Sequence, residues 1–293
     1  MKRIYALVLA AALLLAFAAC GKTQPVGAQE TTGETEAIIT TAVPEETTGE
    51  GESTTETIEV TSAPGESTSQ ATEEETTAKK LPQGKEEIVA YYNEAVNRVK
   101  VEKPGFTWTQ QTSVSNIESS FSFIETAWSL ARPFVPLDVV DMPPAAKGSA
   151  DHDVEFNVRL QPWSSRLAPS MASSATSVDK GSTWELRIDL KPEKCSQLPK
   201  VISDHDHGKV FTVFTYSTIY DLLEPYSWLA TMESFAPSYH DSWVKLTLDK
   251  ETDRPVKAEY MLTYDVLAGA KFVIFPAFEA TATISMHEIY LIG

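Results

Sequence analysis

The stretch 244-VKLTLDKETDRPVKAEYMLTY-264 decides the fold of this chain, because two alternating runs flank a polar turn. Apolar residues recur at every second position from Val244 to Leu248 and again from Val256 to Tyr264. This alternation is typical of a strand with one buried face and one solvated face. Residues 249–255 between the runs are polar and end in a proline, which indicates a turn. The stretch therefore predicts an antiparallel hairpin.

Further strands are predicted on both sides of this hairpin in the sequence. They lie at residues 106–114, 152–160, 184–190, 210–216, 271–275 and 278–291. The segments 133–147 and 161–182 are rich in Pro, Ser or Ala and are predicted to be loops. The strands are numerous enough for one antiparallel sheet.

Helical spacing appears ahead of the strands. Apolar residues from Ile88 to Val99 recur three and four positions apart, and Glu86 and Glu87 fall in the first turn, where they suit the helix dipole. A possible second helix follows the capping-box pattern Ser115-Asn116-Ile117-Glu118 and ends before Pro133. A short helix is predicted at 218–224. The pattern predicts an α+β domain, a curved antiparallel sheet of about six to eight strands packed by an N-terminal helix.

The first residues of the chain carry an export signal. Lys2 and Arg3 precede an apolar run from Ile4 to Phe17, and small residues lead to Cys20. The run is shorter than the about 20 apolar residues of a membrane-spanning helix, so it predicts a secretory signal peptide at residues 1–20. Phe17-Ala18-Ala19-Cys20 resembles the lipobox of bacterial lipoproteins. The resemblance implies a lipid on the Cys20 thiol and anchoring at the extracytoplasmic face of the cell membrane. The alternative is a plain secretory signal in which Cys20 has no role.

Residues 21–80 are rich in Thr and Glu and contain no aromatic side chain. Such a segment cannot bury enough apolar surface to offset the entropy of ordering it, so we expect a disordered linker ahead of one globular domain at residues 81–293. The chain has a formal net charge of -17. Nucleic-acid binding requires a concentrated basic face, which neither part offers. The expected partners are the membrane, through the lipid, and an extracellular ligand.

Two segments carry a family resemblance. The helix sequence EEIVAYYNEAVNRVKVEKPGF (86–106) and the hairpin sequence VKLTLDKETDRPVKAEY (244–260) resemble an uncharacterised domain of lipoproteins from Gram-positive anaerobes. That resemblance covers most of residues 85–293. More distantly, the Asp-x-x-Thr hairpin is similar to hairpins of curved-sheet lipid-carrier lipoproteins, whose sheet wraps an apolar cavity. Neither resemblance implies a catalytic residue.

Catalytic motifs are missing from the sequence. It contains no Gly-x-Ser-x-Gly elbow, Cys-x-x-Cys pair or glycine-rich nucleotide loop. Cys195 has no recognisable histidine or asparagine signature, so we interpret it as structural or incidental. We predict no catalytic residue.

The densest group of possible metal ligands is Asp204-His205-Asp206-His207, with His152 on a distant predicted strand. Carboxylates and imidazoles at this density could bind zinc or calcium. The competing interpretation is a solvated polar loop before Gly208. We favour the solvated loop and expect no cofactor.

Aromatic side chains form the second candidate site. They are Trp163, Tyr226, Trp228, Tyr239 and Trp243. Such rings could stack on sugars or line an apolar pocket. We favour the alternative, packing in the core or in loops.

These observations favour a non-enzymatic binding or interaction module displayed on a flexible tether, with a glycan, peptide or lipid-like ligand. The alternative is an extracytoplasmic hydrolase, metal-assisted through the His/Asp loop. The concave face of the sheet would discriminate between ligands: a deep apolar cavity favours lipid-like cargo, a shallow aromatic groove polysaccharide, and a filled core a protein partner.

Overall fold

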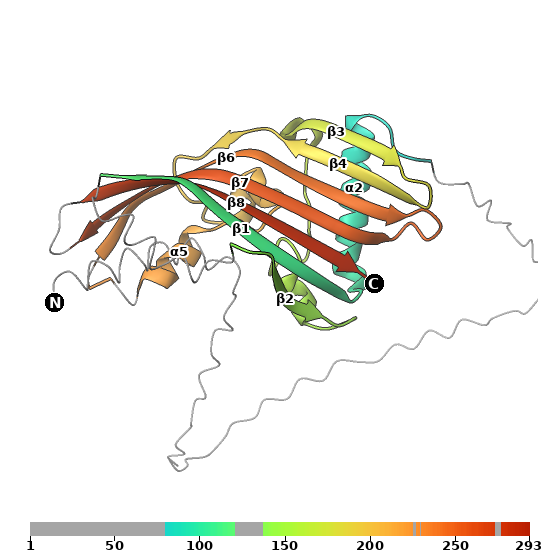
Figure 1. Cartoon of the computed structure of the whole chain (residues 1–293), viewed down its shortest axis with the longest axis horizontal. Coiled ribbons are helices and arrows are strands. Elements are labelled where there is room, and N and C mark those ends of the chain that lie inside the picture. The colour runs from blue at the N-terminus through green and yellow to red at the C-terminus, as the bar shows by residue number, and fades with distance from the viewer. Residues whose placement is uncertain (1–79, 121–136, 225–226, 229, 273–276) are drawn as a thin grey trace, which may run out of the picture. The chain divides into compact units, whose positions relative to one another are not determined.

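The computed structural model describes residues 80–120, 137–224, 227–228, 230–272 and 277–293. In these residues the chain forms one antiparallel sheet of eight strands with a few helices, which confirms the predicted α+β class. Figure 1 shows the long strands bending along their length. The predicted signal peptide, Cys20 and nearly all of the predicted linker lie outside the described residues.

The sheet has the strand order β2-β1-β8-β7-β6-β4-β3, and the short β5 pairs with β6 beside this path. The predicted hairpin is confirmed as β6 and β7, which pair from Ala230–Phe272 to Leu248–Pro255. The first long strand, β1, pairs with the last, β8, so strands from the two ends of the sequence lie side by side next to the edge strand β2. The strand bounds are β1 (Phe106–Ser119), β2 (Val140–Ala145), β3 (Ala172–Asp179), β4 (Thr183–Leu190), β5 (Glu193–Lys194), β6 (Ala230–Asp249), β7 (Pro255–Phe272) and β8 (Phe278–Ile292).

Helix α2 (Lys85–Glu102) is the predicted N-terminal helix. Its apolar face, which includes Ile88, Tyr92 and Val96, is buried against the sheet, where α2 contacts β3, β4 and β7. The helix ends at Lys103, whose φ of 47° is left-handed. No helix in the described residues is long and apolar enough to span a membrane.

An irregular segment, made of residues 156–171 and 195–214 on either side of β3, β4 and β5, packs against the same inner face of the sheet as α2. Phe156 contacts Tyr290 of β8, and Phe211 contacts Tyr260 of β7. The segment follows α4 (Asp151–Glu155), contains η3 (Pro169–Met171), η4 (Ile202–Asp204) and η5 (His207–Lys209), and precedes α5 (Tyr216–Leu223). The predicted short helix at 218–224 is confirmed by α5.

Side-chain amides satisfy the buried backbone of this irregular segment. Asn97 Oδ1 accepts the backbone N–H groups of Ser164 (2.7 Å) and Ser165 (2.9 Å), and Asn93 Nδ2 donates to the Leu167 carbonyl at 2.8 Å. Within the segment, Asn157 Nδ2 donates to the Val210 carbonyl at 2.7 Å. A buried loop needs such partners because unpaired backbone groups are costly.

The strand predicted at 152–160 is wrong. Residues 151–155 form α4, and Val158 and Leu160 have left-handed φ angles of 51° and 62°, which break an extended run. Phe156 and Val158 are nevertheless fully buried. The alternating pattern therefore reflects burial, but the backbone pairs with side chains rather than with a strand. Lys100 Nζ donates to the Phe156 and Val158 carbonyls at 3.1 and 3.3 Å, and the Arg159 N–H donates to Thr212 Oγ1 at 3.1 Å.

The second predicted helix is wrong where the structure describes it. Ser115–Ser119 belong to β1 and pair with β8 as far as Ser119–Ala280, with a register shift after Ser115. Long-range strand pairing overrides the local capping signal. Residues 121–131 of that prediction lie outside the described residues.

Four other segments differ from the prediction. Val210, Phe211, Val213 and Phe214 are buried but join no strand, since Asn157 pairs with the backbone of Val210 and Thr212, and Tyr216 begins α5. Two predicted loops contain the edge strands β2 and β3, whose sequences are rich in Pro or Ser. Edge strands tolerate such residues because only one side is hydrogen-bonded. The strand predicted at 271–275 is the end of β7 as far as Phe272, and residues 273–275 lie outside the described residues.

Candidate functional site

Glu193 contacts two of the predicted metal ligands, His205 and His207. Strand β5 places it opposite Tyr239 of β6. Its carboxylate accepts the backbone N–H groups of Asp206 and His207, both at 2.9 Å. The Nδ1 atom of His207 lies 2.9 Å from Oε2, and that of His205 lies 3.5 Å from Oε1. The two histidines therefore share one carboxylate.

Gly208 closes the loop that carries these histidines. A Cβ atom at this position would lie 1.6 Å from the carbonyl oxygen of Ile202. A side chain there would force the two backbone segments apart. The close approach holds residues 202–208 in a compact turn beside β5.

The contacts of Glu193 keep its carboxylate ionised. Burial alone would raise its pKa, but the hydrogen bonds from the His207 ring and from the backbone N–H groups of His207 and Asp206 lower the pKa to about 2. The ring of His207 is buried and stacks on Tyr239 with centroids 4.5 Å apart. Glu193 is therefore a fixed negative charge next to two imidazoles.

Cys195 follows Glu193 by two residues and completes a mixed donor group. Its backbone N–H donates to the Pro237 carbonyl at 2.9 Å, and its side chain is buried. Burial, with the Glu193 charge, raises the pKa of the thiol to about 12. One ligand atom each from Glu193, Cys195 and His205 lies within 4.8 Å of the others. Carboxylate, sulfur and imidazole are all zinc donors.

The other predicted metal ligands have different partners. Asp204 accepts the Val201 N–H at 3.0 Å, and Asp206 pairs with Lys209 at 2.8 Å. His152 is buried and stacks on Phe156, with centroids 5.3 Å apart. Among the described residues, His205 is the predicted ligand that lies in a group of possible metal donors, with Glu193 and Cys195, whereas Asp204, Asp206 and His152 do not belong to this group.

Sequence reasoning missed Glu193 and its relation to Cys195. Strand β5 has two residues, too few for a periodic signal, and its pairing with β6 joins positions far apart in sequence. The two-residue spacing of Glu193 and Cys195 beside a histidine-rich loop was the available signal.

The five predicted aromatic residues do not gather at one place in the described residues. Trp163 and Tyr239 are buried in the core. Trp228 is 67% exposed, and Tyr226 lies outside the described residues. Trp243 is the member that lies on the outer face of the sheet, between inward-facing neighbours on β6.

A β-bulge brings Trp243 to this outer face. Asp241 has a left-handed φ of 50°, and the β6–β7 register shifts between His240 and Trp243. Tyr239 points inward before the bulge, whereas Val244 and Leu246 point inward after it. The extra residue changes which positions face the core.

Neighbours on four strands surround Trp243, and we call the set the Trp243 patch. The Arg187 guanidinium lies 4.3 Å from the Trp243 ring centroid and is held there by Asp189, at 3.0 and 2.8 Å. The His287 ring lies edge-on at 5.7 Å. The patch consists of Arg187, Trp243, Lys245, Glu259, Met261 and His287, which are adjacent in the sheet register.

Ion pairs fix the charged members of the patch. Glu259 contacts Lys245 at 2.7 Å, Lys257 at 2.9 Å and His287 at 3.7 Å. Burial raises the pKa of the Glu259 carboxyl, but Lys245 and Lys257 together lower it by more. The net shift of the pKa is therefore downward. The patch is therefore a preorganised mixture of aromatic, apolar and paired charged side chains.

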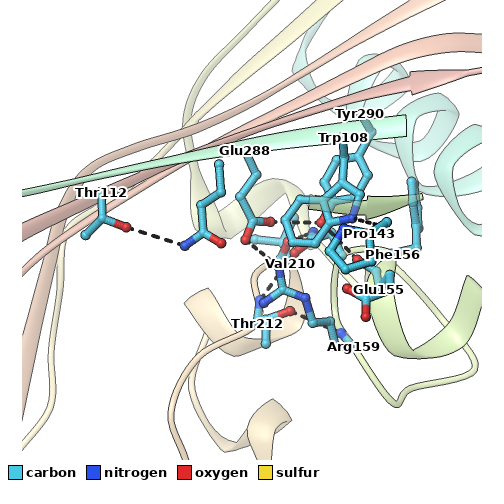
Figure 2. A network of polar contacts seen from close by, with 12 residues as sticks. Trp108, Thr112, Pro143, Glu155, Phe156, Arg159, Val210, Thr212, Glu288 and Tyr290 are labelled. Carbon is cyan, nitrogen blue, oxygen red and sulfur yellow. Dashed lines mark hydrogen bonds and ion pairs between the residues drawn. The ribbon is translucent and has the colours of Figure 1, made fainter. Parts of the chain in front are cut away.

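The inner face of the sheet holds a buried polar network, which Figure 2 shows. Arg159 pairs with Glu288 at 2.6 Å, and the Tyr290 hydroxyl donates to the other Glu288 oxygen at 3.0 Å. The Arg159 guanidinium also lies 4.8 Å from the Trp108 ring centroid. The network ties residues 156–160 to β1 and β8.

Two pockets lie between the sheet and the irregular segment, each with a cavity volume of about 10 Å³. Both are lined by Thr212, Leu262 and Met286, and Glu288 borders one of them. Small-molecule sites have volumes of roughly 300–1,000 Å³, so these pockets are small for a lipid-like ligand. Comparisons of the chain with protein-family models, with curated proteins and with solved structures found no match.

Proposed function

We propose that this chain is a lipid-anchored, extracytoplasmic, non-enzymatic interaction module that binds a protein partner through the Trp243 patch. The observation that carries the proposal is the filled inner face of the sheet. Inward-facing residues of four strands, among them Leu186, Leu246, Ile284 and Tyr290, are fully buried under α2 and the irregular segment. Cargo inside the sheet would have to displace this core, so binding at the outer surface is favoured.

The composition of the patch supports a protein partner. Trp and Arg are enriched among residues that dominate protein–protein binding energies, and Met is enriched at interfaces. Leu291 extends the apolar surface along β8 and is 55% exposed. The side chains stand on paired strands and are fixed by ion pairs, so little conformational entropy is lost on binding.

A displayed random-peptide library, screened against the purified full chain, tests the binding function. Peptides that bind the native chain should bind Trp243→Ala more weakly by about 30-fold, the loss of about 2 kcal/mol expected for a central aromatic. Trp228→Ala is the matched control, since it removes an exposed tryptophan outside the patch. Unchanged binding by Trp243→Ala, or binding of glycans in place of peptides, would overturn the proposal.

Lipid anchoring is tested separately in a bacterial host. Cells expressing the chain are labelled with a palmitate analogue, and label and membrane association are compared for the native chain and Cys20→Ser. The native chain should carry the label in the membrane fraction, and the variant should lose both. Label retained by Cys20→Ser would show that the thiol is not the anchor.

A metal-assisted extracytoplasmic hydrolase is the second candidate, favoured by the Glu193–Cys195–His205 group. Three protein ligands on zinc leave a fourth position for water, as in catalytic sites. Ester, peptide and phosphoester probes with added zinc test it. Turnover that is lost in His205→Ala would replace the interaction module by this alternative.

A further inference from the structure

We propose that Glu193, Cys195 and His205 together bind one divalent cation of the zinc class. This site differs from the Asp/His loop indicated by the sequence, since two of its three donors come from β5 and the residue after it. It does not rest on the proposed protein binding at the Trp243 patch.

The donor geometry is close to that of a zinc site. Zinc–sulfur and zinc–nitrogen bonds of about 2.3 and 2.0 Å place tetrahedral ligand atoms roughly 3.5 Å apart. His205 Nδ1 and Glu193 Oε1 already lie 3.5 Å apart, and the three ligand atoms lie within 4.8 Å of one another. A small rotation of the partly exposed His205 ring would close the remaining difference.

Surrounding contacts orient the carboxylate before any ion binds. Glu193 is held by the ring Nδ1 of His207 and by two backbone N–H groups, each at 2.9 Å. Ligating carboxylates in metal sites are commonly hydrogen-bonded in this way. The loop that supplies these donors is closed by Gly208, where no side chain fits. His207 therefore acts as a positioning residue.

The side chains of Glu193 and His205 are 20% and 22% exposed, so an ion could reach them from solvent, whereas Cys195 closes the site from the core.

The donor set selects the cation. Thiolate and imidazole favour zinc and its neighbours, whereas calcium and magnesium take oxygen ligands. On binding, the Cys195 S–H bond is replaced by a sulfur–metal bond and the proton passes to solvent, with no change of oxidation state. We therefore expect zinc or cobalt to bind and calcium not to bind.

The test is metal titration of the full chain carrying Cys20→Ser, which leaves Cys195 as the one thiol of the chain. Zinc content is measured by elemental analysis after dialysis, and cobalt is followed by its near-ultraviolet thiolate charge-transfer band. We expect one zinc per chain and a cobalt band that zinc removes. In His205→Ala, zinc affinity should fall by about 10- to 100-fold.

Further variants distinguish zinc binding at this site from zinc binding elsewhere on the chain. Cys195→Ala should abolish the charge-transfer band, and circular dichroism reports whether that variant folds. His240→Ala removes a histidine outside the site, and Trp243→Ala disrupts the patch; both should bind zinc as the parent does. Substoichiometric zinc in the parent, or equal affinity in the folded His205→Ala, would overturn the proposal.

Discussion

His152 is a buried base without a hydrogen-bond partner on either ring nitrogen among the described residues. It packs against Phe106 and Phe156 at the start of the irregular segment. Burial, with the nearby Lys100 charge, lowers its pKa to about 4, although Asp153 opposes the shift. The sequence placed it in a metal group, whereas its surroundings favour an uncharged ring in an aromatic cluster.

His152 should make stability fall in weak acid. Because its folded pKa lies below the unfolded value of about 6.5, the unfolded state takes up more protons between about pH 6.5 and 4. The free energy of unfolding should therefore drop by about 1 kcal/mol more between about pH 7.5 and 5.5 in the native chain than in His152→Phe. Urea denaturation at both pH values measures this difference.

His240 is a control, because its pKa is shifted upward in the folded chain, opposite to that of His152. Its hydrogen bond to Asp241 raises its pKa, partly offset by burial, so its stabilising contribution is present in weak acid and lost as the pH rises through the folded pKa. His240→Gln should accordingly lose stability at about pH 5.5 rather than gain it. Identical pH dependence in the native chain and His152→Phe would contradict the assignment of a neutral, buried His152.

The Arg159–Glu288 pair is the second residue-scale test. Both side chains are about 95% buried (5% and 6% exposed), so Arg159→Met leaves the Glu288 carboxylate without its cation in the core. We expect a loss of about 3–5 kcal/mol in the free energy of unfolding, measured by urea denaturation. The double variant Arg159→Met/Glu288→Leu should recover much of this loss, because it removes both buried charges.

The exposed pair Lys250–Asp179 is the matched control. Its side chains are partly open to solvent, so Lys250→Met should lower the free energy of unfolding much less than Arg159→Met does. Equal losses at the buried and exposed pairs would show that the inner network does not hold the irregular segment to the sheet.

At the scale of elements, the β6–β7 turn also holds helix α2. Asp253 in this turn accepts hydrogen bonds from the Tyr91 hydroxyl and the Arg98 guanidinium, both on α2. It has a left-handed φ of 57°. The Asp249 carboxylate accepts the Thr252 N–H and hydroxyl at 2.8 Å each, which fixes the turn. One turn thus sets the hairpin register and anchors the helix.

The stability of Asp253 variants should depend on two properties of this residue, its carboxylate contacts to α2 and its left-handed backbone. Asp253→Asn tolerates the left-handed backbone and can accept one hydrogen bond, so it should cost least. Asp253→Gly loses the carboxylate contacts but not the backbone conformation. Asp253→Ala loses both and should be less stable than the glycine variant by about 1 kcal/mol, measured by urea denaturation. An alanine variant as stable as the glycine variant would contradict a strained position.

Local sequence patterns correctly predicted the elements that are formed by neighbouring residues in the sequence and have one buried face. The hairpin and α2 were predictable because period-2 and helical spacing, with a polar turn between strands, directly reflect their exposed and buried faces. Residues 152–160 were not predictable, because the backbone around the buried Phe156 and Val158 is irregular and forms hydrogen bonds with the side chains of Lys100 and Thr212, which lie more than 50 positions away. The same limit explains the Ser115–Glu118 capping pattern, which long-range pairing with β8 overrides.

The candidate sites were less predictable than the fold. His205 and His207 were identified, but their common partner, Glu193, is positioned by a two-residue strand paired across the sheet. The patch around Trp243 depends on a bulge at Asp241 that moves the ring to the outer face. Neither arrangement leaves a periodic signal in the sequence, because each is created by tertiary pairing.

At the scale of the whole molecule, the described residues fall within one compact unit that includes Lys80–Gly293. Its first and last strands pair side by side, and Gly293 N–H donates to the Gly105 carbonyl at 2.9 Å. The segment ahead of α2 belongs to this unit as well. The Pro82 carbonyl accepts the Ser177 hydroxyl of edge strand β3 at 2.6 Å, and Leu81 packs against the core.

These contacts predict where the folding unit begins. A chain of residues 80–293 should unfold at the same urea midpoint as the full chain, since the contacts described above lie within it. A chain of residues 85–293 should lose about 1–2 kcal/mol, because it lacks the Leu81 packing and the Pro82–Ser177 hydrogen bond. Ser177→Ala in the longer chain is the matched control for the hydrogen bond alone and should cost about 1 kcal/mol.

A lower midpoint for residues 80–293 than for the full chain would show that residues before Lys80 help to hold the fold. Equal midpoints would instead leave those residues free to act as the tether of a lipid-anchored module, since stability would then be independent of them.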